Sequence, residues 1–206
     1  MNSREPLLKP VAIADLRPTQ ITLGFHEVDQ KRKEWRGKTG DDGDAFLGRH
    51  MIPSVLGPKG RHYIIDNHHL ARALHEEGVQ QVLVTVAADL TALSKSSFWT
   101  FLDNRAWCHP YDSAGRRTEF AAIPDSIDKL HDDPFRSLAG DLRHAGGFAK
   151  DVTPFAEFLW ADFLRKRFKR KSVEKNFAAA LRKAVALSKT RDAAYLPGWC
   201  GPDPIG

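Results

Sequence analysis

Residues 62–78, HYIIDNHHLARALHEEG, constrain the fold of this chain more than any other stretch. From His62 to Ile65 the residues form a short β-type apolar run, which stops at Asp66. The apolar residues that follow have helical spacing: Leu70, Ala71, Ala73 and Leu74. Gly78 is the expected left-handed end of this helix. The stretch therefore predicts a buried strand, an abrupt polar turn and an amphipathic helix.

The helix is followed by a second β-rich run, VQQVLVTVA (79–87). A strand, a helix and a strand in so short a span predict a compact βαβ unit, whose crossover we expect to be right-handed. The turn DNHH (66–69) then lies where a strand ends and a helix begins. Because free backbone N–H groups and the positive end of the helix dipole meet there, the turn predicts an anion-binding site.

Composition narrows the class of protein. With 206 residues and 42% hydrophobic content, the chain can bury a substantial core. No apolar run approaches the length of a membrane span, and the N-terminus MNSREPLLKP lacks the apolar core of a signal peptide. The only two cysteines, Cys108 and Cys200, have no close spacing and give neither a disulfide framework nor a zinc motif. We therefore expect a cytoplasmic protein that makes no membrane contact.

Three segments surround the central stretch. FHEVDQKRKEW (25–35) predicts a helix, whereas the glycine-rich, acidic residues 37–50 predict a surface loop. The loop lacks the glutamate that a calcium-binding EF-hand requires, because Pro53 stands at that position. Residues 51–56 and 62–65, joined by the turn signal GPKG, predict a hairpin that leads into the central unit.

After the second strand, Asp89 or Thr91 is a candidate cap for a helix that runs to about Trp107. The next segment, CHPYDSAGRR (108–117), is dense in ionisable groups. Two interpretations fit it equally: a wall of the functional site, or an ordinary polar connection.

From Ile123 onward the sequence predicts helices. Asp133 and Thr153 each precede a proline and are candidate N-caps, and two long helices are expected at 154–170 and 173–189. The excess positive charge lies here, because residues 151–206 hold 11 Lys and Arg against 6 Asp and Glu. Within the run RKRFKRK, the candidate nucleic-acid contacts are Arg165, Lys166, Arg167, Lys169, Arg170 and Lys171. A solvated helix face is the alternative.

Several of these motifs carry a family resemblance. DNHHLARAL (66–74) resembles the phosphate-binding box of the ParB/sulfiredoxin superfamily, and LRPTQITLG (16–24) resembles the Pro-x-Gln stretch that precedes this box. DDPFRSLAGDLRHAGGFAK (132–150) extends the match, so that the chain resembles a bacterial family of ParB-like nucleases over about residues 8–170.

The resemblance implies an α/β (α+β) fold, with a small mixed sheet and helices in a ParB/sulfiredoxin-like domain. We expect this domain over residues 8–122, and a helical C-terminal extension packed on it over residues 123–206. A chromosome-partitioning role is disfavoured, because no helix-turn-helix follows the box.

The resemblance also implies a phosphate-bearing nucleotide, ATP or ADP with Mg²⁺, at the DNHH turn, for phosphoryl transfer or phosphate hydrolysis. The implied nucleotide contacts are Gln20, Asn67, His68, His69 and Arg72. The implied catalytic residues are Glu27, Asp66 and His69, with Glu27 or Asp66 as the general base. Asp66 would either orient a histidine or bind Mg²⁺.

Two positions of the box depart from the usual pattern: Asn67 replaces a glycine, and Leu70 replaces an arginine. Asp66 has a simpler interpretation as a helix N-cap, and the two histidines as first-turn residues bonded to carbonyls. Two other functions stay open. One is a nuclease; the other is a non-catalytic DNA-binding protein that uses the basic C-terminal helix.

Overall fold

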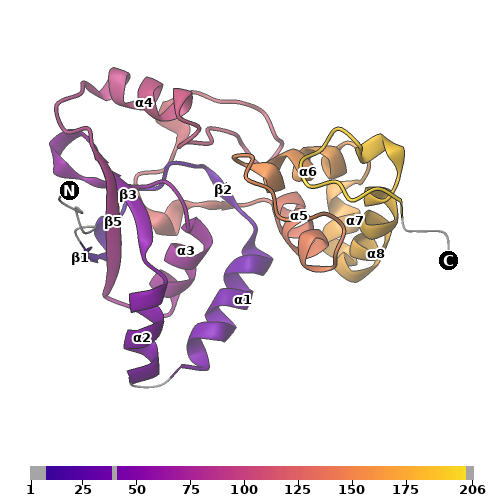
Figure 1. Cartoon of the computed structure of the whole chain (residues 1–206), viewed down its shortest axis with the longest axis horizontal. Helices are drawn as coiled ribbons and strands as arrows, with labels where there is room; N and C mark the ends of the chain where they lie inside the picture. The colour runs from indigo at the N-terminus through magenta and orange to yellow at the C-terminus, as the bar shows by residue number, and fades with distance from the viewer. Residues whose placement is uncertain (1–7, 39–40, 203–206) are drawn as a thin grey trace, which may run out of the picture. The chain divides into compact units, whose positions relative to one another are not determined.

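The structure is a computed structural model that describes residues 8–38 and 41–202 (Figure 1). Its Cα packing separates two compact units. Unit 1 comprises Met1–Thr22, Val28–Asp112 and Arg117–His131, and unit 2 comprises Leu23–Glu27, Ser113–Arg116 and Asp132–Gly206. The predicted α+β class is confirmed. The expected division between residues 122 and 123 stays a prediction.

Unit 1 contains a mixed four-stranded sheet in the order β1-β5-β3-β4. Its strands are β1 (Leu8–Ala12), β3 (Ile52–Leu56), β4 (His62–Ile64) and β5 (Gln81–Asp89). β3 is parallel to β5, whereas β1 is antiparallel to β5 and β4 is antiparallel to β3. Pro10 lies in β1, an edge strand, where a missing N–H costs least. A second sheet pairs β2 (Thr22–Leu23) with β6 (His131–Asp132).

The predicted βαβ unit has a different connectivity. β4 and β5 are not neighbours, and they run in opposite directions because β4 is antiparallel to β3 while β3 is parallel to β5. The parallel crossover therefore joins β3 to β5, through β4 and α3 (His68–Glu76). The reason is the hairpin: a strand that turns straight back on its neighbour must be antiparallel to it. The predicted hairpin itself is confirmed.

The ends of α3 agree with the sequence. Gly78 has φ 75°, its N–H bonds to the carbonyl of His75, and the N–H of Val79 bonds to Leu74. This left-handed ending satisfies carbonyls that a helix C-terminus leaves unpaired. At the other end Asn67 also adopts the left-handed conformation, with φ 59° and ψ 28°. Both positions therefore have the backbone geometry that glycine or asparagine tolerates best.

The predicted helix over 25–35 is confirmed as α1 (Phe25–Arg36). The surface loop predicted over 37–50 is wrong for residues 41–49, and residues 39–40 of that stretch lie outside the described residues. Residues Asp41–Arg49 form α2. Phe46 is buried, with its ring 5.8 Å from that of Trp35 and 4.1 Å from that of His50. This aromatic packing stabilises a helix that the glycines and aspartates of the stretch concealed.

In unit 1, α4 (Lys95–Asn104) begins later than expected, because Ser94 is its cap and accepts the N–H of Ser97. Asp89 instead accepts hydrogen bonds from the N–H and hydroxyl of Thr91, so the predicted caps at these two positions are wrong. Short 3-10 turns complete the description: Ile13–Asp15, Pro58–Gly60, Phe120–Ala122, Ile127–Lys129 and, in unit 2, Arg191–Ala193.

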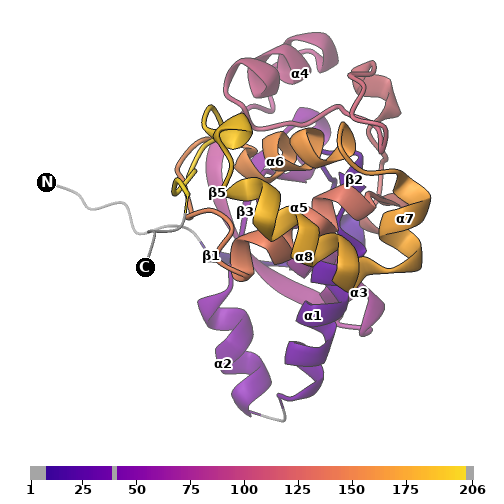
Figure 2. The same cartoon turned by 90° about the vertical axis from the view of Figure 1, so that its right-hand side faces the viewer.

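Unit 2 is built mainly of helices (Figure 2). Its core includes Phe148, Trp160 and Phe163. Its helices are α5 (Pro134–His144), α6 (Ala156–Arg165), α7 (Arg170–Lys175) and α8 (Phe177–Ser188). The cap predicted at Asp133 is confirmed, whereas Phe155, not Thr153, occupies the N-cap position of α6.

The two long C-terminal helices are shorter than expected. α6 ends at Arg165, and the helix expected over 173–189 is divided at Asn176 into α7 and α8. The basic run 165–171 therefore ends one helix and begins the next, so the expected single basic helix is wrong. None of the helices within 8–38 and 41–202 is both long and apolar enough to cross a membrane.

Candidate functional site

The DNHH turn joins β4 to α3 within unit 1. Asn67 occupies the N-cap position, and its side chain makes no capping hydrogen bond to the helix. Its amide nitrogen donates instead to the carbonyl of Met51, at 3.1 Å. Asp66 is exposed and accepts the N–H of Asn67 at 2.7 Å, so its proposed role as the helix N-cap is wrong. In the described contacts, neither Asn67 nor Asp66 therefore caps α3 with its side chain, and an uncapped helix start is a favourable place for an anion.

His68 is buried and held from the Pro-x-Gln stretch. Its Nε2 accepts the backbone N–H of Thr19 at 3.1 Å, while the Thr19 hydroxyl donates to the carbonyl of Ile64 at 2.8 Å. Burial, followed by the charges of His69 and His109, lowers the pKa of His68 to about 3. Because Nε2 is an acceptor, we assign the neutral tautomer with its proton on Nδ1. His68 thus positions the turn and stays uncharged at neutral pH.

The structure brings His109 to this turn, a residue that the sequence did not single out as a ligand. Its N–H donates to the carbonyl of Thr19 at 2.8 Å, its backbone bridges to Gln20, and its ring stacks on Tyr111 at 4.4 Å. His109 and His69 are both close enough to disfavour protonation of His68. The density of ionisable groups in CHPYDSAGRR was the one signal of this placement.

Gln20 is buried, and its side-chain amide donates to the carbonyl of Thr22 at 2.8 Å. The side chain thus bonds the first residue of β2, two positions further along the chain. The backbone beside it serves the turn more directly, because Thr19 contacts both His68 and His109. The Pro-x-Gln stretch therefore supports the site through its main chain.

Arg72 is engaged inside unit 1. Its Nε pairs with Glu76 at 2.6 Å, and one terminal nitrogen donates to three backbone carbonyls, those of Ile127, Asp128 and Leu130. These contacts tie the turn Ile127–Lys129 to α3. The Arg72 guanidinium therefore stabilises the packing of this turn against α3. Phosphate binding by Arg72 stays a prediction.

Glu27 lies in unit 2, in the first turn of α1. Its Oε2 is 3.2 Å from a guanidinium nitrogen of Arg136, which is buried and lies over the ring of Phe158 at 5.3 Å. Gly140 allows this packing, since a Cβ there would lie 3.2 Å from the Arg136 nitrogen and 3.4 Å from Oε2. The carboxylate is therefore held in a defined place by a buried cation.

The basic run divides by residue type. Its three arginines have carboxylate partners: Arg165 with Asp133 and Asp162, Arg167 with Asp192, and Arg170 with Glu174. Lys166, Lys169 and Lys171 are exposed and form no ion pair within the described ranges. The lysines are thus the part of the run that offers free positive charge to a polyanion.

The side chains at the turn restrict the metal chemistry. Among the described residues, no group of three or more His, Cys, Asp or Glu could hold a metal ion. Mg²⁺ is often bound by one or two carboxylates together with substrate phosphates, and the exposed Asp66 fits that limited role. Thiolate chemistry fits poorly, because burial and then the neighbouring Asp103 raise the pKa of Cys108 to about 12.

Comparisons with known proteins agree with this fold. A family described as "Putative ParB-like nuclease" matches residues 9–166, and the chain belongs to this family. Among solved structures, the crystal structure of protein Atu1540 from Agrobacterium tumefaciens is similar, with 50% sequence identity and a TM-score of 0.91. The similarity covers 97% of this chain and 100% of that one. No curated protein matches the chain.

Proposed function

We propose that the chain binds the phosphate groups of ATP or ADP at the start of α3 and acts on them by Mg²⁺-dependent transfer or hydrolysis. The observation that carries this proposal is the helix start itself, where Asn67 is left-handed and gives α3 no side-chain cap. Such a terminus presents N–H donors and a positive dipole end to an anion. Family membership is consistent with a phosphate substrate.

Each residue of the DNHH turn would have a different role in binding the nucleotide. His68 is kept neutral chiefly by burial, which lowers its pKa, and the N–H of Thr19 holds its ring in place at the first helical turn. His69, the next residue along, would contact the phosphate. Asp66 would hold Mg²⁺ together with phosphate oxygens, and the ion would neutralise the charge that develops on the transferring group.

Two carboxylates are proposed as the general base, Asp66 in unit 1 and Glu27 in unit 2. Their surroundings differ, because Asp66 is exposed and Glu27 is paired with a buried arginine. The variants Asp66→Asn and Glu27→Gln remove each carboxylate without a large change in volume. The base is the one whose loss lowers turnover while nucleotide binding is kept.

The direct test is calorimetric titration of ATP and ADP, each with Mg²⁺, into the wild type and His69→Ala. His75→Ala is the matched control, because His75 lies in the last turn of the same helix. We expect binding to the wild type and to the control, and at least tenfold weaker binding to His69→Ala. Absence of binding to the wild type, or equal binding to all three proteins, would exclude the nucleotide site.

A nuclease is the second candidate, and the family description favours it. It would use the same turn on a phosphodiester, with Lys166, Lys169 and Lys171 supplying contacts to the polyanion. Cleavage of DNA in Mg²⁺ that Asp66→Asn abolishes would support it. DNA binding without cleavage, which weakens steeply with salt and survives His69→Ala, would instead indicate a non-catalytic DNA-binding protein.

A further inference from the structure

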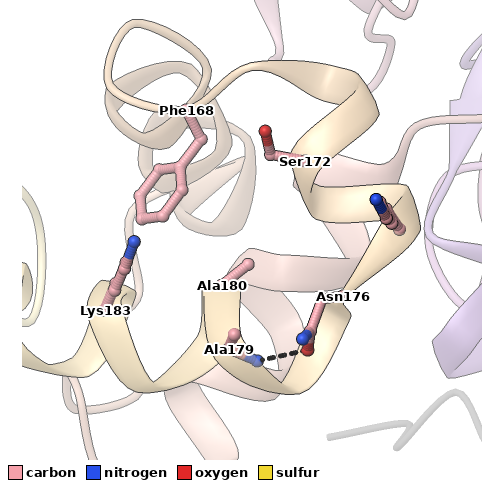
Figure 3. A pocket seen from close by; sticks show the side chains of 7 residues that line it. Phe168, Ser172, Asn176, Ala179, Ala180 and Lys183 are labelled. Atoms are coloured by element: carbon pink, nitrogen blue, oxygen red, sulfur yellow. Dashed lines mark hydrogen bonds between the residues drawn. The ribbon is translucent and has the colours of Figure 1, made fainter.

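Unit 2 contains a pocket of about 380 Å³, and its lining includes none of the residues assigned to the DNHH turn (Figure 3). Its volume falls within the range of roughly 300–1,000 Å³ that is typical of small-molecule sites. The lining comes from α7, from α8 and from the residues just before each helix: Phe168, Ser172, Lys175, Asn176, Ala179, Ala180 and Lys183.

The break between α7 and α8 builds the pocket. Asn176 ends one helix and caps the next, with its side-chain oxygen accepting the N–H of Ala179 at 3.0 Å (Figure 3). The cap leaves the amide nitrogen of Asn176 as a hydrogen-bond donor. Ala179 and Ala180 are small enough to leave space beside the aromatic ring of Phe168. A polar rim and an apolar wall are thus combined in one cavity.

The charge of the lining has one sign. Lys175 and Lys183 are its only ionisable residues, and both side chains are exposed and without an ion pair within the described ranges. The neighbouring Glu174 carboxylate does not neutralise them, because it pairs with Arg170 at 2.8 Å. Ser172 and Asn176 add uncharged donors. The pocket therefore favours an anion with more than one oxygen acceptor.

We propose that this pocket binds a small organic phosphate whose remaining part is a flat ring. The phosphate dianion would be bound by Lys175 and Lys183, since two ammonium groups match its charge of nearly −2 at neutral pH. The ring would pack on Phe168 and over the two alanines, where an inorganic anion would leave apolar surface uncovered. The proposal does not depend on the function assigned to the DNHH turn.

Phenyl phosphate is the probe for this site, with inorganic phosphate and phenol as its two halves. Calorimetric titration should show phenyl phosphate binding at least tenfold more tightly than inorganic phosphate, and no binding of phenol. Lys183→Gln and Lys175→Gln should each weaken phenyl phosphate by about tenfold. Arg182→Gln is the matched control, because Arg182 is an exposed cation of α8 outside the lining.

A second variant separates the cavity from general attraction between charges. Ala179→Leu keeps both lysines and the capping N–H but fills the space beside Phe168, so it should abolish binding. His69→Ala should leave the affinity for phenyl phosphate unchanged, and a loss there would place the ligand at α3 and overturn the proposal.

Two further outcomes would also overturn it. Equal weakening by Arg182→Gln and Lys183→Gln would mean that the surface attracts anions without a specific site. Binding of a short single-stranded DNA that depends on Lys183, with no binding of phenyl phosphate, would mean that the surface serves nucleic acid.

Discussion

The start of α3 in unit 1 and the start of α5 in unit 2 differ in how their first backbone N–H groups are satisfied. An aspartate lies directly before α5 and two residues before the first residue of α3, and both helix starts leave backbone N–H groups that need a partner. At α5 the carboxylate of Asp133 accepts the N–H of Phe135 at 3.0 Å and pairs with Arg165 at 2.5 Å. At α3 the carboxylate of Asp66 accepts only the N–H of Asn67 in the described contacts, and Asn67 leaves the helix without a side-chain cap.

The difference shows which helix start is available to a ligand. The positive end of α5 is already neutralised by a buried carboxylate of the chain itself, so an external anion would gain little there. The pKa of Asp133 is raised, chiefly by burial, although Arg165 opposes the shift. In the part of the chain that the structure describes, no buried carboxylate is recorded as a cap of α3, and this contrast supports the proposal that its anion comes from outside.

Removing the Asp133 carboxylate from the start of α5 should have the largest effect on stability. Asp133→Ala should lower the free energy of unfolding by about 3 kcal/mol or more, because it deletes the helix cap and takes a carboxylate from a partly buried arginine. Urea denaturation measures the change. Asp133→Asn is the control, since it keeps the cap and loses only the charge; a larger loss in that variant would contradict the explanation.

The buried imidazole at the start of α3 should make stability depend on pH. The pKa of His68 is about 3 in the folded protein, below that of an unfolded histidine near 6.5, so the unfolded state binds more protons between these values. Stability due to the neutral ring is complete above about pH 6.5 and is lost as the pH falls toward 3. The loss from pH 7 to pH 5 should be about 2 kcal/mol.

The variant His68→Gln tests the assignment, because its side-chain oxygen can still accept the N–H of Thr19 but does not titrate. Urea denaturation at pH 7 and pH 5 should show a smaller difference in the variant than in the wild type. An identical pH dependence in both proteins would mean that His68 is not the titrating group.

A carboxylate introduced at the start of α3 should make this helix start resemble that of α5, which the carboxylate of Asp133 caps. Asn67→Asp puts a carboxylate beside the helix start in a backbone conformation that aspartate tolerates. It should weaken nucleotide binding about tenfold, a change of about 1.4 kcal/mol. It should also lower thermal stability slightly, because aspartate cannot donate the hydrogen bond that the Asn67 amide makes to the carbonyl of Met51. Calorimetry with ATP and Mg²⁺ measures the affinity; unchanged binding would argue against a phosphate at this terminus.

The smallest effect is expected when Asn67 is replaced by the glycine that is usual at this position. Asn67→Gly relieves the left-handed backbone strain but deletes the hydrogen bond to Met51. These terms oppose each other, so the change in unfolding free energy should stay within about 1 kcal/mol. A loss well beyond that, measured by urea denaturation, would show that the amide of Asn67 is a structural element of the turn.

Much of the local structure followed from short-range patterns. Gly78 and Asn67 have the left-handed geometry expected of them, and Asp133 caps its helix. α2 was missed because its stability depends on Phe46 packing against Trp35, a contact between separate elements. The predicted start of α4 was too early, because several residues in sequence could cap this helix and Ser94 is the one that does.

The sequence alone determined that a polar turn with two histidines separates a short strand from an amphipathic helix. Apolar periodicity and a glycine stop are local, and they need no distant contact. Only the tertiary structure decided that Thr19 bonds His68, that His109 joins the turn and that Arg72 is tied to Ile127–Lys129. These partners are tens of residues apart, and only burial and hydrogen bonding in the folded chain select them.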